Sequence, residues 1–144
     1  MTQEEFLSTM KSQGAYFAPG VPEKDIKITN TYLQQMYAAM IPDFIQKLYI
    51  KTGGINLGSG YIFGPSEFNI GINFPVPNII DINRPVIKHP QMRGKTVFGR
   101  NDLFWFAFDS FGKCFMLDNL NLKTLRKYED SYKALTDCLI AGKN

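Results

Sequence analysis

The sequence has little of the material from which most catalytic and metal sites are built. Its 144 residues include one histidine, His89, and two cysteines, Cys114 and Cys138. A zinc site with the usual ligand set needs about four such side chains, and nothing in the sequence places a nucleophile beside His89. We therefore predict no catalytic residues, no metal site and no cofactor. The two cysteines are expected to be buried free thiols, and a disulfide between them stays open.

Long apolar runs are also missing. The N-terminal stretch MTQEEFLSTMKSQ is polar and acidic, whereas a signal peptide is basic and then apolar. No run approaches the length that a membrane-spanning helix needs, so we expect a soluble, cytoplasmic protein. Hydrophobic residues make up 44% of the chain and aromatic residues 14%. This composition and length predict one ordered domain over residues 1–144.

One segment has no acidic residues. The net charge is only +3, but residues 84–100 contain no Asp or Glu and carry the basic residues Arg84, Lys88, Arg93, Lys95 and Arg100. Nucleic acid is not the expected partner, because the sequence pI is only about 8.8 and the segment lacks the aromatic ladder of single-strand binders. A charged recognition loop for a protein partner explains the run equally well.

The first part of the chain shows two helix patterns separated by a loop pattern. Thr2 opens a capping box for a short first helix. Residues 14–27 contain glycines and prolines and are expected to form a connecting loop. Thr29 or Asn30 is predicted to cap a second helix, whose inner face carries the apolar residues spaced between Leu33 and Met40.

The stretch from Pro42 to Gly64 combines a helix, a glycine stop and a strand. Pro42 suits the first turn of a helix, and the apolar residues after it recur every three to four positions. Gly53 is predicted to end this helix in a left-handed conformation. From Ile55 onward, aromatic and aliphatic residues spaced by glycines favour a strand or hairpin.

Residues 65–95 differ in kind from the rest of the chain. They hold five of the eight prolines, which excludes regular central strands because proline cannot donate to a sheet ladder. Long, non-repetitive segments with apolar content often pack as ordered loops that carry binding residues. A plain crossover connection is an equally good interpretation.

The last third reads as a hairpin followed by a helix. Residues 103–108 form an almost continuous apolar run, which predicts a central strand covered on both faces. A turn at 110–112 and a strand from Cys114 follow, and a closing helix is predicted around 132–140. Asp109 and Asp118 are more simply turn residues than an acid/base pair. Together these patterns predict an α+β domain: a twisted, mainly antiparallel sheet of about five or six strands, with helices on one side and at the ends.

The helix, glycine stop and strand at 42–64 resemble the core signature of the SUKH superfamily. This superfamily includes yeast cell-wall-synthesis regulators and many bacterial immunity proteins. The hairpin at 104–118 and the helix at 132–140 resemble it too. On the helix before the proline, where members often carry a glutamate, this chain has Gln34 and Gln35.

The resemblance implies a non-catalytic immunity protein that binds and neutralises a bacterial toxin domain. A regulatory or scaffold module that binds a cellular protein is the alternative, and an enzyme with its active site on the central loop is a third class. We expect an apolar patch with a basic rim to bind the protein partner. The predicted partner-binding residues are Tyr61, Phe63, Phe68 and Phe74 in the patch and Arg84, Arg93 and Arg100 at the rim.

Overall fold

Seven strands form one antiparallel sheet in the computed structural model, which describes residues 1–71 and 74–143. The strand order is β1-β2-β3-β6-β7-β8-β9. Their bounds are β1 Tyr16–Phe17, β2 Ile55–Leu57, β3 Gly60–Ile62, β6 Lys95–Arg100, β7 Phe104–Asp109, β8 Cys114–Asp118 and β9 Thr124–Tyr128. The predicted α+β class is confirmed. The sheet is larger than expected because β1 lies in a stretch that was expected to be a loop.

One face of the sheet is apolar and largely buried. Side chains alternate along a strand, so Phe106 and Phe108 point to the same side of β7. The ring of Phe98 packs against both, with centroid distances of 6.5 Å to Phe106 and 5.9 Å to Phe108. All three side chains are inaccessible to solvent, and burying each contributes about 1.5–3 kcal/mol. This cluster is the centre of the core.

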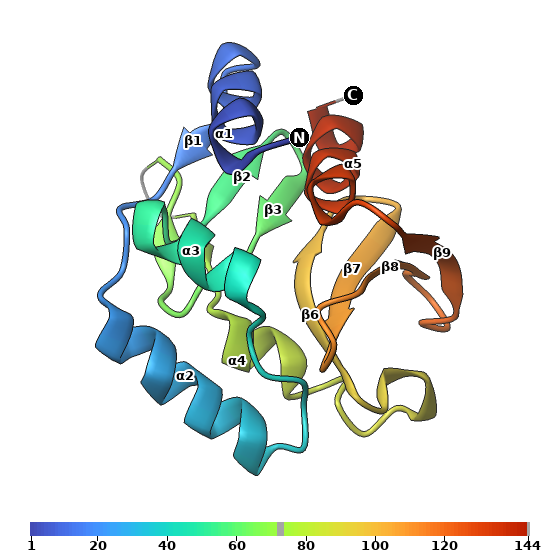
Figure 1. Cartoon of the computed structure of the whole chain (residues 1–144). Coiled ribbons are helices and arrows are strands. Elements are labelled where there is room, and N and C mark those ends of the chain that lie inside the picture. The colour runs from blue at the N-terminus through green and yellow to red at the C-terminus, as the bar shows by residue number, and fades with distance from the viewer. Residues whose placement is uncertain (72–73, 144) are drawn as a thin grey trace.

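Three helices cover the apolar face. They are α1 (Gln3–Ser12), α3 (Asp43–Lys51) and α5 (Ser131–Lys143), which lie on the same side of the sheet in Figure 1. α5 contacts every strand from β2 to β9 in the large sheet. The rings of Phe6 in α1 and Phe44 in α3 both pack against Tyr132 of α5, at 5.8 and 5.9 Å. Thr2 caps α1 as predicted, since its Oγ accepts from the N–H of Glu5 at 3.1 Å.

The second helix differs from the prediction at both ends. α2 covers Glu23–Gln35, so it begins inside the expected loop and ends before Tyr37, which has a φ of 61° and is 89% exposed. Thr29 and Asn30 lie inside α2 and do not cap it. The Thr29 hydroxyl donates to the carbonyl four residues earlier, and Asn30 Oδ1 accepts from the N–H of Ile41 at 2.8 Å. The side chain of Thr29 therefore makes a hydrogen bond within α2, and that of Asn30 makes one to a residue outside it. The local sequence pattern does not distinguish such residues from helix caps.

The glycine after α3 does not adopt the conformation that was predicted for it. α3 begins directly after Pro42 and ends at Lys51, close to the expected bounds. Gly53, however, does not adopt a positive φ. A Cβ on Gly53 would lie 2.9 Å from the carbonyl oxygen of Pro19, and a Cβ on Gly64 would overlap the carbonyl oxygen of Gly53. The prediction of a left-handed stop is wrong, because the missing Cβ at Gly53 allows the close approach of the Pro19 backbone.

Residues 65–95, here called the crossover segment, connect β3 to β6. Asn83 ties this segment to the sheet through two hydrogen bonds with Val97. The elements of the segment are β4 (Phe68–Asn69), which pairs with β5 (Pro75–Val76), then α4 (Ile79–Asn83) and the short 3-10 helix η1 (Pro90–Met92).

Among the residues that the structure describes, no helix is long and apolar enough to cross a membrane.

Candidate binding groove

A row of side chains crosses the second face of the sheet, opposite the helices. Tyr61 in β3 is paired with Arg100 in β6, and Arg100 is paired with Trp105 in β7. Paired residues on neighbouring strands point to the same face, so these three side chains lie next to one another. The guanidinium carbon of Arg100 lies 5.6 Å from the centre of the Trp105 ring. This cation–π contact holds the guanidinium over the indole.

Three aromatic rings form a stack that begins in the core and ends at the surface. The Tyr61 ring lies 6.4 Å from Phe63 with an interplanar angle of 3°, and 6.5 Å from Phe74 with an angle of 10°. Such parallel rings with separated centres are offset rather than face to face. Phe63 is 2% exposed, whereas Phe74 is 52% exposed. Tyr61 therefore connects a core side chain to one that solvent reaches.

The stack lines an open groove between the sheet and the crossover segment. Its volume is about 320 Å³. Tyr61, Phe63 and Arg100 form the sheet wall, and residues 74–77 form the opposite wall. Two residues of this second wall are prolines, which have no N–H and cannot pair fully with an added strand. Binding in the groove therefore depends on side chains rather than on strand addition.

One end of the groove carries two opposite charges. Arg100 and Asp102 both line it and both are exposed. Within residues 1–71 and 74–143 neither of them takes part in an ion pair. Asn101, between them, is 2% exposed and fixes the turn, because its Oδ1 accepts from the N–H groups of Leu103 and Phe104 at 2.9 Å. A ligand in the groove can reach both charged groups without breaking an existing ion pair.

Two exposed leucines lie on turns at this end of the sheet. Leu103 is 59% exposed and Leu120 is 89% exposed. Asn119 Nδ2 donates to the Asp102 carbonyl at 3.4 Å, which joins the two turns. The Asp118 carboxylate accepts from the backbone N–H groups of residues 120 and 121, and these hydrogen bonds lower the pKa of Asp118. The turns therefore present apolar side chains on an ordered backbone.

Four of the seven predicted partner-binding residues come together in the groove: Tyr61, Phe63, Phe74 and Arg100. Phe68 does not, because it is 8% exposed and its ring stacks on Tyr16 at 6.2 Å. The Phe68 ring fills the space in front of Gly54, where a Cβ would overlap it. Phe68 is therefore a core residue in this structure.

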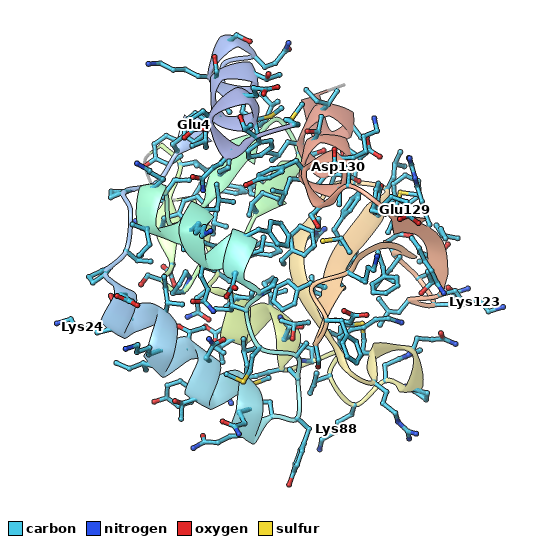
Figure 2. All side chains as sticks on the ribbon, in the orientation of Figure 1. Glu4, Lys24, Lys88, Lys123, Glu129 and Asp130 are labelled. Atoms are coloured by element: carbon cyan, nitrogen blue, oxygen red, sulfur yellow. The ribbon has the colours of Figure 1, made fainter. Side chains whose placement is uncertain are left out.

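The other two predicted arginines lie beside different hollows. Arg84 lines a hollow between α2 and α4, and its Nε lies 3.7 Å from the carboxylate of Asp81. Arg93 lines a hollow with Tyr37 and His89. Lys88, from the same basic stretch, points away from the body in Figure 2. The three arginines therefore do not form one rim, and a role for Arg84 and Arg93 in partner binding stays a prediction.

The sequence prediction missed Trp105, Asp102 and Leu103 as surface residues. Residues 103–108 were expected to form a strand covered on both faces. Instead Leu103 lies outside β7 and is exposed, while Trp105 is only half-buried on the face opposite the buried Phe106. The available signal was the polar pair Asn101-Asp102 next to Leu103, which is typical of a turn.

The two thiols are not available for chemistry. Cys114 and Cys138 are free and buried, as predicted. Burial raises the pKa of Cys114 to about 12, and it raises the pKa of Cys138 as well. A protonated thiol is a poor nucleophile and a poor metal ligand. These cysteines therefore belong to the core.

The remaining candidates for chemistry are engaged in turns. Nδ1 of the exposed His89 accepts from the N–H of Gln91 at 3.1 Å. Asp109 accepts from the N–H groups of Phe111 and Lys113 at 2.9 and 3.0 Å, which confirms its predicted turn role. In the described part of the chain, no three His, Cys, Asp or Glu side chains gather as a metal site would require.

No family model matches the chain, and no curated protein matches it. The resemblance to the SUKH superfamily therefore rests on the motifs at 42–64 and 104–140, and membership of that superfamily stays a prediction.

Proposed function

We propose that this chain is a non-catalytic protein-binding domain that holds its partner at the groove, and that the partner is a toxin domain which it neutralises in the bacterial cytoplasm. The observation that carries the proposal is the aromatic stack of Tyr61, Phe63 and Phe74. It is anchored in the core at one end and open to solvent at the other.

The arrangement of the stack supports protein binding. Interfaces derive most of their affinity from a few well-packed aromatic and arginine side chains that neighbouring residues shield from water. Tyr61 and Phe74 supply the aromatic surface, and Phe63 behind them keeps Tyr61 in place. Leu103 and Leu120 add exposed apolar side chains on turns beside the charged end. A partner that covers these groups gains apolar burial with little ordering of this chain.

The immunity role comes from the sequence motifs at 42–64 and 104–140. An immunity protein needs a rigid surface and no chemistry of its own, and a core-anchored groove fits that need. Inhibitors of nucleases present acidic surfaces that mimic the substrate, whereas this chain has a net charge of +3. The charge supports a toxin that is not a nuclease.

Co-expression with the product of the adjacent gene tests the proposal. We expect this product to be toxic, and the wild-type chain to restore growth of cells that produce it and to copurify with it. The double variant Tyr61→Ala/Phe74→Ala should lose both effects, because it removes the exposed part of the stack.

A matched control is available on α2. Ile28 and Tyr32 are 54% and 49% exposed and lie outside the groove, so Ile28→Ala/Tyr32→Ala removes similar side chains and should keep protection. If the wild-type chain neither protects nor copurifies, the immunity role is excluded. Protection that survives the groove variant and is lost in the α2 variant would exclude the groove as the binding surface.

A further inference from the structure

The charged end of the groove indicates which chemical group the partner should carry. Arg100 is exposed, and its guanidinium is held over the Trp105 ring at 5.6 Å. No carboxylate among the described residues pairs with it. A guanidinium presents a planar fork of N–H donors that matches a carboxylate. Because the stacking contact already restricts the Arg100 side chain, pairing with a ligand costs less conformational entropy.

Resting on the proposed function, we propose that the partner places an extended segment in the groove, with an apolar side chain against Tyr61 and Phe74 and an Asp or Glu carboxylate on Arg100. Residues two apart in an extended segment point to the same side. An apolar residue and an acidic residue separated by one position therefore face the sheet wall together. Tyr61 and Arg100 occupy directly paired positions on β3 and β6, so the two receiving groups are also neighbours.

Two charged side chains line the groove, and the basic one is the better positioned. Arg100 is the basic residue of this pair. Asp102 is the one carboxylate that lines the groove, and within residues 1–71 and 74–143 its side chain takes part in no ion pair. Arg100, in contrast, is held by its indole neighbour. The Arg100 guanidinium is therefore better positioned to bind a charged group than the Asp102 carboxylate is. Asp102 repels the carboxylate that we assign to the partner.

Three capped peptides that differ in one residue test this inference without the toxin. They are acetyl-Ala-Phe-Ala-Glu-Ala-amide and the same peptide with Gln or Lys in place of Glu; the caps remove the terminal charges. Trp105 is the only tryptophan of the chain, so its fluorescence and its indole N–H resonance report binding beside Arg100. We expect saturable changes with the Glu peptide, about fivefold weaker binding of the Gln peptide, and weaker binding still of the Lys peptide.

Single-residue variants show which side chain causes the preference for the Glu peptide over the Gln peptide. Arg100→Met keeps a long apolar side chain and should remove the advantage of Glu over Gln. Arg93→Met is the matched control, since Arg93 lies outside the groove, and it should leave the preference unchanged. Asp102→Asn should strengthen binding of the Glu peptide by about twofold to fivefold. Amide resonances of β3 and β6 provide a second readout where Arg100→Met alters the fluorescence of Trp105.

Several results would overturn the inference. These are the absence of saturable binding by the Glu peptide, equal or tighter binding of the Lys peptide, and loss of the preference in Arg93→Met. A failure here leaves copurification of the wild-type chain with the toxin unaffected, so it would reject the carboxylate and not the binding function. Conversely, the peptide preference would survive if the toxin proved to be the wrong partner.

Discussion

Asn83 makes with Val97 the two hydrogen bonds that a neighbouring strand would otherwise make. Its Oδ1 accepts from the Val97 N–H at 2.8 Å, and its Nδ2 donates to the Val97 carbonyl at 2.9 Å. β3 pairs with β6 only at residues 99 and 100, so Val97 lies beyond the reach of that pairing. Asn83 is inaccessible to solvent. This one side chain therefore completes the edge of β6 and attaches α4 and the crossover segment to the sheet.

Replacing Asn83 should destabilise the protein more than its small size suggests. In Asn83→Ala both polar groups of the buried Val97 lose their partner, and each unsatisfied buried group costs about 1–3 kcal/mol. We expect the free energy of unfolding in urea to fall by roughly 3 kcal/mol. Asn78→Ala is a matched control, because Asn78 caps the exposed start of α4 and its loss should cost about 1 kcal/mol. Equal effects of the two variants would contradict the role assigned to Asn83.

The protein should lose stability at alkaline pH through Cys114. Burial raises the pKa of this thiol to about 12 in the folded state, whereas an unfolded cysteine has a pKa of about 8.5. Between these values the unfolded chain releases the proton and the folded chain keeps it. Stability is therefore fully present below the lower value and falls as the pH rises, by up to about 1.4 kcal/mol per pH unit for this group. Urea unfolding at several pH values should show a shallower alkaline decline in Cys114→Ala; an unchanged slope would refute the assignment.

Adding a methyl group at Gly64 should prevent normal folding. A Cβ there would overlap the backbone carbonyl of Gly53, and neither backbone can move without displacing α3 or β3. Gly14→Ala is the control, because it introduces backbone strain without a steric clash. Gly14 has a φ of +87° but open space around its Cβ position, so its replacement should cost only about 1–2 kcal/mol. We expect folded Gly14→Ala and little folded Gly64→Ala, measured by circular dichroism and thermal melting; similar melting temperatures would exclude the close contact.

Much of the fold could be predicted because its signals are local. The Thr2 cap, the helix after Pro42 and the hairpin turn at 110–112 each depend on residues a few positions apart. The start of α2 was missed because the side chains of Thr29 and Asn30 satisfy bonds inside the helix and with Ile41. A sequence pattern records that these residues can cap a helix and does not record which partner they meet.

The groove could be predicted only in part, because it depends on strand register. Tyr61 and Phe74 were recognisable as aromatic residues in a glycine- and proline-rich region. The pairing of Arg100 with Tyr61 on one side and Trp105 on the other arises from the order of β3, β6 and β7. The same long-range order separates Arg84 and Arg93 from Arg100, although all three belong to one basic run in the sequence.

The affinity of the purified chain for the toxin domain that we propose as its partner, measured by titration calorimetry, tests the central claim most directly. We predict that Tyr61→Ala/Phe74→Ala weakens binding by about 100-fold, as expected when two interface anchors are lost. Ile28→Ala/Tyr32→Ala on α2 should change it by less than about threefold. Equal affinities of the wild-type chain and the groove variant would contradict the claim that the partner binds at the aromatic stack.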